Sequence, residues 1–194
     1  MRVFLETERL LLRQFTGTDA DDLFALYDDP EVMRYLNGGE PADRAEIEKH
    51  DLPAFLAYYE RFPGYGFWAA IEKSSGAFLG WFHFRPLRGH HTDDPELGYR
   101  LNRSSWGKGY ATEGSLAILE KGFTEFGARR IWAATMAVNL GSRRVMEKIG
   151  MRHVRTYHED FDDPIPGTEE GEVEYAITLE EWRALTRGAP HPED

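Results

Sequence analysis

The 194-residue sequence contains no cysteine. A disulfide, a thiolate nucleophile and a cysteine-based zinc site are therefore excluded. No apolar run approaches the roughly 20 residues that a membrane-spanning helix needs, and the first residues lead into no hydrophobic signal segment. These absences predict a soluble, cytoplasmic protein.

Positive charge is also scarce, since 23 Lys and Arg stand against 34 Asp and Glu, giving a net charge of −11. A nucleic-acid partner requires a clustered basic face, so the balance argues against one and suits a cationic acceptor better. The content of hydrophobic residues, 41%, is that of a globular protein. We expect one domain over residues 1–194, with a polar tail from about residue 187.

Gly107 and Gly109 lie between a predicted strand, residues 95–101, and a predicted helix. In that helix Leu116, Leu119, Phe123 and Phe126 recur at helical spacing, and Gly127 follows as a stop. The first amides of a helix have no internal partners, and glycine lets an anion approach them. The turn is therefore predicted to hold a phosphate group, with the charge of Lys108 beside it, although such a pair of glycines can also form a plain tight turn.

Two familiar phosphate loops are excluded by spacing. The sequence has neither G-x-x-x-x-G-K-[ST] nor G-x-G-x-x-G at this turn. A nucleotide-binding protein that uses the turn for ATP or NAD is thus disfavoured.

A second strand and helix follow. Residues 130–138 are rich in apolar side chains and run into Asn139, which is suited to cap a helix. Ser142, Val145, Met146 and Ile149 fall on one face of that helix, and Gly150 ends it. The predicted order is strand, phosphate turn, helix, strand, Asn cap, short helix and strand.

With this order the sequence resembles the GCN5-related N-acetyltransferase (GNAT) superfamily, in particular the branch of ribosomal-protein N-terminal acetyltransferases. The segments that carry the resemblance are PELGYRL (95–101), WGKGYATEG (106–114), NLGSRRVMEKIGM (139–151) and EYAITLEEW (174–182). The resemblance implies an α/β fold with a mixed, mostly antiparallel central sheet flanked by helices, in which two central strands splay apart. It also implies acetyl-CoA as co-substrate, without a metal, and dimers are common among such relatives.

The resemblance further implies where acetyl-CoA binds. Pantetheine would enter between strand 95–101 and the strand ending at Val138, and bond to the backbone near Tyr99 and Leu101. The pyrophosphate would rest on the amides of the turn and the start of the helix, namely Trp106, Gly107, Lys108, Gly109, Tyr110 and Ala111. Arg103, Arg143 and Arg144 are cations within possible reach of the other phosphates, but we expect Lys108 to matter most. The family pattern often has Gln or Arg where this sequence has Ser104.

Acetylation of an amine needs a proton acceptor, a donor to the oxyanion and a proton or hydrogen bond for the leaving thiolate. Without cysteine, direct transfer in a ternary complex is expected. Glu96, at a position that often carries a catalytic Glu in the resembled family, is the first candidate base, acting through water. A structural, salt-bridged Glu is the open alternative, and His83 is the second candidate base.

For the thiolate we consider Ser142, with Asn139 positioning the pantetheine arm. Many relatives have a tyrosine seven residues after this Asn, where this chain has Met146. Some members of the branch have a serine at Ser142, so the role can pass to it. Both residues would serve equally well in capping the helix, and this alternative stays open.

The remaining segments bear on the acceptor. Two predicted helices, one after a Thr18 cap and one over residues 43–59 that Pro53 interrupts, would form the acceptor wall by resemblance. The acidic loop 159–172 would attract a cation such as a protein N-terminus or a small amine if it borders the cleft. His90, His91, Asp93 and Asp94 suggest a metal site only weakly. A non-catalytic acyl-CoA-binding protein is the alternative function.

Overall fold

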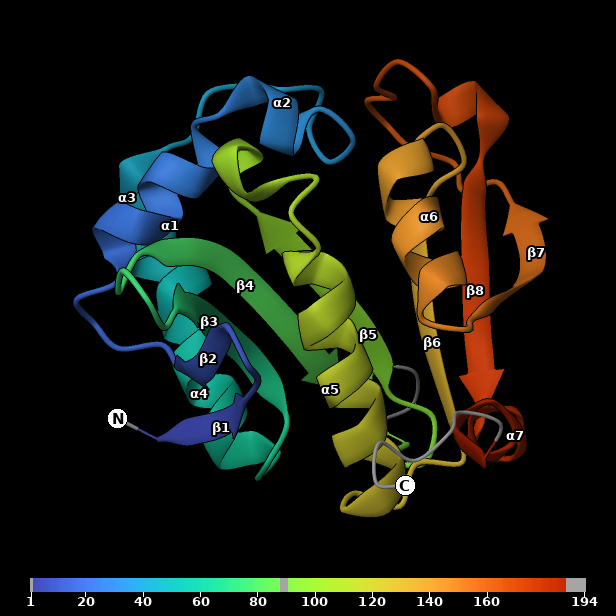
Figure 1. Ribbon diagram of the computed structural model, residues 1–194. Coiled ribbons are helices and arrows are strands. Elements are labelled where there is room, and N and C mark those ends of the chain that lie inside the picture. The colour runs from blue at the N-terminus through green and yellow to red at the C-terminus, as the bar shows by residue number, and fades with distance from the viewer. Residues whose placement is uncertain (1, 88–90, 188–194) are drawn as a thin grey trace.

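The computed structural model describes residues 2–87 and 91–187, and its centre is an eight-stranded sheet of order β1-β2-β3-β4-β5-β6-β8-β7 (Figure 1). The β5–β6 pair is parallel and the other neighbouring pairs are antiparallel. This confirms the predicted mixed, mostly antiparallel sheet. The strands are β1 (Val3–Glu6), β2 (Leu10–Gln14), β3 (Gly66–Glu72), β4 (Phe78–Arg85), β5 (Glu96–Leu101), β6 (Arg130–Met136), β7 (Arg152–Tyr157) and β8 (Glu172–Thr178).

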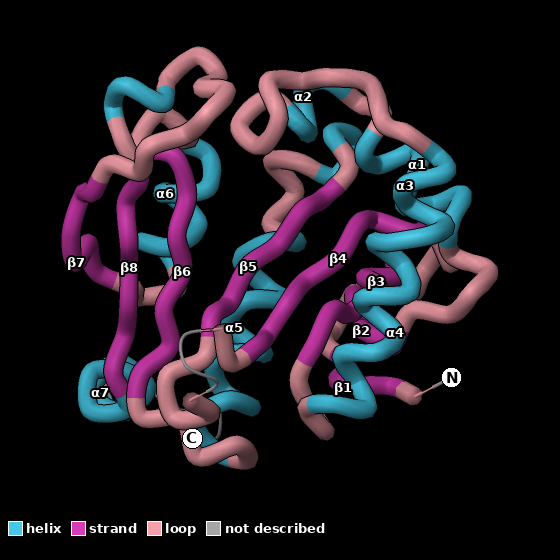
Figure 2. Tube along the Cα trace, turned by 180° about the vertical axis from the view of Figure 1, so that it is seen from behind, coloured by secondary structure: helices cyan, strands magenta, loops and turns pink. Residues whose placement is uncertain are grey.

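Helices cover both faces of the sheet. In Figures 1 and 2, α5 and α6 lie on one face, and α1, α3 and α4 cover β2 to β4 on the other. Each layer encloses its own hydrophobic cluster, one including Phe82, Ile118 and Leu119 and the other including Leu23, Phe55 and Phe67. The helices are α1 (Ala20–Tyr27), α2 (Pro30–Met33), α3 (Arg44–Glu46), α4 (Leu52–Arg61), α5 (Tyr110–Thr124), α6 (Leu140–Lys148) and α7 (Leu179–Arg187).

The two central strands diverge, as predicted. β5 and β6 share one ladder position, Glu96 opposite Trp132, at the start of β5. The whole length of β5 pairs with β4, and the whole length of β6 pairs with β8. Each strand is thus held on its outer side while the inner sides separate beyond Glu96, as Figure 2 shows.

Helix α5 packs closely on the sheet because two of its glycines face β4. A Cβ added at Gly114 would clash with the Phe82 ring, and one at Gly122 would lie 2.8 Å from Phe84 Cζ. The buried face of α5 also includes Ser115, Ile118, Leu119 and Phe123. The expectation that Leu116 lies on this buried face is wrong, because Leu116 is 45% exposed. A helix turns by about 100° per residue, so Leu116 points away from the direction of the buried Ser115 that precedes it.

Two sequence patterns near the N-terminus mislead. Residues 5–15, whose apolar side chains cluster at Leu10 to Leu12, suggest the start of one strand, but they form parts of a hairpin, because the chain turns between β1 and β2, where the Thr7 amide donates to the Leu10 carbonyl at 2.9 Å. Asp19, not Thr18, precedes α1. The Asp19 carboxylate makes no cap bond to α1, because it binds the Thr16 amide and the guanidinium of Arg13 instead.

The interruption at Pro53 is confirmed. Between α3 and α4 the chain forms a π-helical turn, Ile47–Asp51, and Pro53 lies in the first turn of α4. Proline cannot donate a backbone hydrogen bond, so a helix that reaches it must adjust its preceding turn. Here the widened turn is that adjustment.

No helix among the described residues is long and apolar enough to cross a membrane. Within residues 2–87 and 91–187, no three His, Asp or Glu side chains group as a metal site. His90, one member of the weak metal candidate, lies outside the described residues.

Candidate active site

The predicted phosphate turn joins the end of β5 to α5. A short 3-10 turn, Arg103–Ser105, leads into Gly107 and Gly109, whose φ angles are 72° and 85°. Such left-handed conformations favour glycine. Helix α5 starts at Tyr110, and no hydrogen bond among the described residues is donated by the amides of residues 107–112. The turn therefore presents free amides at the positive end of a helix, which fits a phosphate group.

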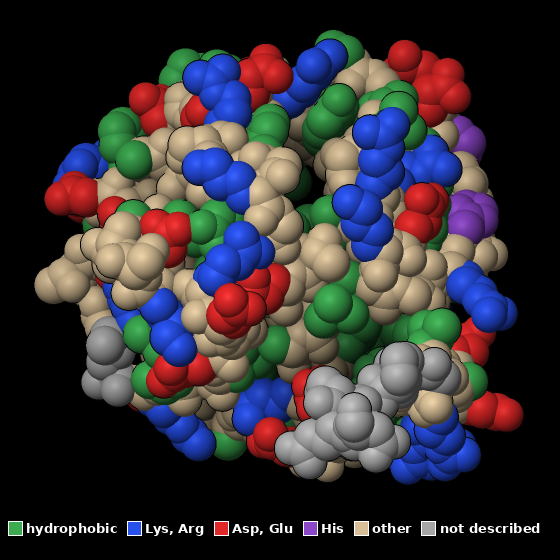
Figure 3. Space-filling model, in the orientation of Figure 1, with side chains coloured by type: hydrophobic (Ala, Val, Ile, Leu, Met, Phe, Trp, Pro, Cys, Tyr) green, Lys and Arg blue, Asp and Glu red, His purple; other side chains and the backbone are tan. Residues whose placement is uncertain are grey.

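Cations surround this turn despite the negative net charge. Figure 3 shows a hollow between the start of α5 and α6, with Lys and Arg gathered on both sides. Arg103 is held by Asp29, with Nε 3.4 Å from Oδ2, and Arg143 donates to the Ala137 carbonyl at 2.9 Å. Lys108 is exposed and makes no ion pair in the described part of the chain. Arg144 is likewise exposed and makes no ion pair in the described part of the chain, so Lys108 and Arg144 are the cations available for a phosphate.

Tyr99, Asn139 and Ser142 come together where β5 faces the start of α6. The Tyr99 hydroxyl donates to the Ser142 carbonyl at 3.1 Å and lies 3.1 Å from Ser142 Oγ. Asn139 Oδ1 accepts from the Ser142 amide at 3.1 Å, which is the predicted helix cap. Burial raises the pKa of Tyr99 to about 12 despite its bond to Ser142, so the phenol is protonated at neutral pH.

Three further positions complete this side of the site. Met146 is 1% exposed and packs in the core, so the position of the relatives' tyrosine offers no polar group here. Leu101 is buried, and its carbonyl accepts from Trp106 Nε1 at 2.8 Å, which ties the turn to the end of β5. Ala111 is half-buried in the first turn of α5.

Glu96 lies in a separate cluster with two residues of β4. Its Oε2 accepts from Arg85 Nε at 2.8 Å and lies 3.3 Å from His83 Nε2. Burial alone would raise the pKa of Glu96, but His83 and Arg85 outweigh it and lower that pKa to about 2. The carboxylate is therefore ionised at neutral pH and paired with Arg85.

His83 is the buried member of this cluster. Burial lowers the pKa of its imidazole against the opposing effect of the Glu96 carboxylate, so the ring is neutral near pH 7. Neither ring nitrogen makes a well-aligned hydrogen bond to any described residue, although Nε2 is within ion-pair distance of Glu96. The ring lies over Gly98, where an added Cβ would be 2.5 Å from Nε2.

The two clusters lie on opposite faces of β5, because side chains alternate along a strand. Glu96 contacts β4 side chains on one face, and Tyr99 contacts α6 on the other. The structure thus brings Tyr99, Asn139 and Ser142 together, and it places Glu96 apart from them at the start of the divergence between β5 and β6.

Sequence reasoning missed two arginines. Arg85 stands opposite Glu96 in the antiparallel register of β4 and β5, and the sequence reveals this pair of opposite charges only once the two strands are known to pair. Arg9 donates to the Lys108 carbonyl at 2.9 Å and pairs with Glu113. It lies 99 residues before Lys108, and nothing in the sequence signals that contact.

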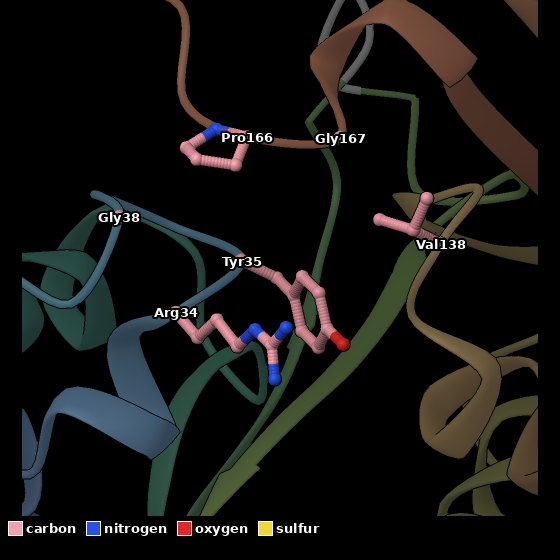
Figure 4. Close-up of a pocket in the computed structure, with 6 residues that line it drawn as sticks. All are labelled: Arg34, Tyr35, Gly38, Val138, Pro166 and Gly167. Atoms are coloured by element: carbon pink, nitrogen blue, oxygen red, sulfur yellow. The ribbon is translucent and has the colours of Figure 1, made fainter.

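A cavity of about 330 Å³ opens where β6 ends (Figure 4). Arg34, Tyr35 and Gly38 line it from the segment after α2, and Pro166 and Gly167 from the connection between β7 and β8. Figure 4 shows the Tyr35 side chain pointing toward the side of the cavity where Val138 lies. The 159–172 loop and the segment after α2 therefore meet at one cavity.

Comparison with known proteins identifies the family. The model of the acetyltransferase (GNAT) domain matches residues 9–152. The FsC-acetyl coenzyme A-N(2)-transacetylase of Aspergillus fumigatus is 36% identical over 190 residues, which cover 94% of this chain and 79% of that protein. The uncharacterized N-acetyltransferase YnaD of Bacillus subtilis is 34% identical over 92% of this chain and 98% of its own length.

Solved structures of acetyltransferases have a similar fold. A GNAT-family acetyltransferase from Bacillus anthracis superposes with a TM-score of 0.71 at 29% identity, over 92% of this chain and 99% of that one. RimL, a ribosomal L7/L12 alpha-N-protein acetyltransferase in complex with coenzyme A, has a TM-score of 0.75 at 16% identity over 93% and 99% of the two chains, a likeness of fold. The chain thus belongs to the GNAT family of acetyltransferases.

Proposed function

We propose that this acetyltransferase moves the acetyl group of acetyl-CoA directly to a primary amine, either a protein N-terminal α-amine or a small cationic amine. The observation that carries the proposal is that the phosphate turn and the Tyr99–Ser142–Asn139 cluster both flank the divergence of β5 and β6. The proposal treats the chain as a single domain, because both hydrophobic clusters pack against one sheet. Family membership disfavours the non-catalytic alternative.

The co-substrate supplies an activated acetyl thioester, and the chain's own groups fit it. The free amides of the Gly107–Gly109 turn and the exposed Lys108 ammonium suit the pyrophosphate. The inner edges of β5 and β6, left without mutual ladder bonds beyond Glu96, offer backbone donors and acceptors for the pantetheine amides.

Glu96 would assist removal of the proton from the acceptor ammonium. A carboxylate with a pKa of about 2 holds a proton poorly, so Glu96 acts best by orienting the water that accepts the proton and by stabilising the positive charge that forms there. Its hydrogen bond to Arg85 fixes its orientation. His83, neutral at pH 7, is the second candidate for proton acceptor.

Ser142 would stabilise the leaving thiolate. Tyr99 is protonated at neutral pH and its hydroxyl lies 3.1 Å from both the carbonyl oxygen and Oγ of Ser142. When the Tyr99 hydroxyl donates a hydrogen bond to Ser142 Oγ, the Ser142 hydroxyl can donate a hydrogen bond to the thiolate, and both residues keep their protons. Asn139 holds the Ser142 amide and so fixes the start of α6.

The cavity beside Val138 is the proposed entrance for the acceptor. The 159–172 segment that forms one side carries Glu159, Asp160, Glu169 and Glu170, whose negative charge attracts an ammonium group. The A. fumigatus relative is named for transfer to a nitrogen, N(2), which supports a nitrogen acceptor in general.

The test is release of free thiol from acetyl-CoA across a panel of amines that includes peptides with free N-termini. We expect turnover with one amine class, an approximately 100-fold lower kcat for Glu96→Gln, and roughly tenfold lower for Ser142→Ala. Glu120→Gln and Ser74→Ala, at exposed positions away from the site, are the matched controls and should keep full activity. Acetyl-CoA binding without turnover on any amine would contradict the proposal.

A further inference from the structure

Arg9 lies in the turn between β1 and β2, yet its side chain is directed at the phosphate turn. Its NH1 donates to the Lys108 carbonyl at 2.9 Å, and its Cζ lies 4.4 Å from the centre of the Tyr110 ring. Its NH2 is 3.4 Å from where a Cβ on Gly109 would be. One side chain thus contacts Lys108 and Tyr110 and lies beside Gly109, which stands between them.

We propose that Arg9 is the positioning residue of the phosphate turn, fixing the Lys108–Gly109 peptide so that its amide faces the pyrophosphate of acetyl-CoA. The inference rests on the proposed placement of the pyrophosphate at this turn. A trans peptide is planar, with its C=O and N–H pointing in opposite directions. Because Arg9 holds the Lys108 carbonyl, the Gly109 N–H is directed away from Arg9.

The turn needs such an anchor because of its own sequence. Lys108 stands between two glycines in left-handed conformations, and glycine has the largest backbone freedom of any residue. Ordering these residues only when a ligand arrives would reduce affinity. An external hydrogen bond to the Lys108 carbonyl removes part of that freedom before binding.

Arg9 is itself held rigidly. Glu113, in the first turn of α5, accepts from Arg9 Nε at 2.6 Å, from the Arg9 amide at 2.9 Å and from Thr7 Oγ1 at 2.5 Å. The Lys73 amide donates to the Arg9 carbonyl at 2.8 Å, which ties the β1–β2 turn to the end of β3. The anchor therefore connects the phosphate turn to the sheet.

Glu113 also indicates that the role of Arg9 is geometric rather than electrostatic. The Glu113 carboxylate lies 2.6 Å from Arg9 NH2, so the charge of the guanidinium is largely neutralised. Lys108 makes no ion pair in the described chain, so its charge stays available to a phosphate. A residue that only supplied charge would not be paired in this way.

The test compares acetyl-CoA with acetyl-pantetheine, which has the same thioester and no pyrophosphate. For Arg9→Ala we expect kcat/KM with acetyl-CoA to fall about tenfold, kcat at saturation to change less than twofold, and kcat/KM with acetyl-pantetheine to stay the same. Calorimetry with CoA, which needs no acceptor, should show a Kd about tenfold higher. Arg152→Ala, which removes an exposed arginine paired with Glu181, is the control.

Three outcomes separate the possibilities. If wild type uses both thioesters equally well, the placement of the pyrophosphate fails, and with it this inference. If wild type prefers acetyl-CoA and Arg9→Ala keeps the full preference, the role of Arg9 alone is overturned. If Arg9→Ala combined with Glu113→Gln restores wild-type Kd, the loss came from the unpaired Glu113 charge and not from positioning, which also overturns it.

Discussion

At the scale of single residues, Arg85 determines what Glu96 can do. The sequence left two roles open for Glu96, a catalytic group and a salt-bridged strand residue. The structure contains an ion pair between Glu96 and Arg85, with Nε 2.8 Å from Oε2. This ion pair orients the carboxylate at the point where β5 and β6 separate. Both roles are therefore compatible with one geometry, and the ion pair is a means of holding a functional group in place.

Because of this ion pair, we expect the stability of the folded protein to depend on pH. The pKa of Glu96 is lowered from 4.5 to about 2 on folding. A group whose pKa is depressed in the folded state adds stability above its unfolded pKa and loses it as pH falls through the folded one. The stabilisation that goes with this shift is present at pH 7, where Arg85 pairs with the carboxylate, and it decreases from about pH 5 downward.

Urea unfolding of wild type and Glu96→Gln between pH 7 and pH 3.5 measures this directly. We expect the variant to be less stable at pH 7 and the difference to shrink as the pH falls below 4.5. Glu120→Gln should show a pH profile parallel to wild type, since that side chain is exposed. A Glu96→Gln difference that stays constant over this range would show that the pKa is not depressed.

At the scale of elements, the position of α5 sets the site, because the phosphate turn is its first turn. Gly114 and Gly122 let this helix approach β4 so closely that Phe82 and Phe84 fill the space of missing Cβ atoms. The close contact offsets the cost of glycine in a helix interior, which is about 1 kcal/mol relative to alanine.

We therefore predict that Gly114→Ala destabilises the protein by about 1–3 kcal/mol, although alanine is the better helix former. The added methyl group would collide with the Phe82 ring. Gly141→Ala in α6 is the matched control, because its Cβ would lie 3.7 Å from Asn139 Oδ1, an ordinary contact. Thermal and urea unfolding give the measurement, and equal stabilities of the two variants would contradict the packing argument.

Some elements of the fold and the site can be predicted from the sequence, and others cannot. The turn at Gly107–Gly109, the Asn139 cap and the order of strands and helices around them follow from local patterns, and the structure has them. The β1–β2 hairpin escaped detection because the Thr7–Leu10 turn contains neither glycine nor proline. The contact of Arg9 with Lys108 escaped because it depends on tertiary packing and has no local signature.

At the scale of the whole molecule, β5 and β6 diverge between two faces of the sheet that carry different groups. Helices α5 and α6, with the phosphate turn and Ser142, cover one face of the sheet, and Glu96, His83 and Arg85 lie on the other. A thioester that enters from the first face would meet an amine held on the second. This arrangement favours both substrates being bound at once.

The absence of cysteine supports the same order of events, because no thiol in this chain can hold the acetyl group between two half-reactions. We therefore propose that the amine attacks the thioester of bound acetyl-CoA directly, in a ternary complex.

Initial rates measured over a grid of acetyl-CoA and amine concentrations test that claim most directly. We expect double-reciprocal lines that intersect, because both substrates must be bound before either product leaves. Parallel lines, together with acetyl-protein formed from acetyl-CoA in the absence of amine, would show a covalent intermediate and contradict direct transfer.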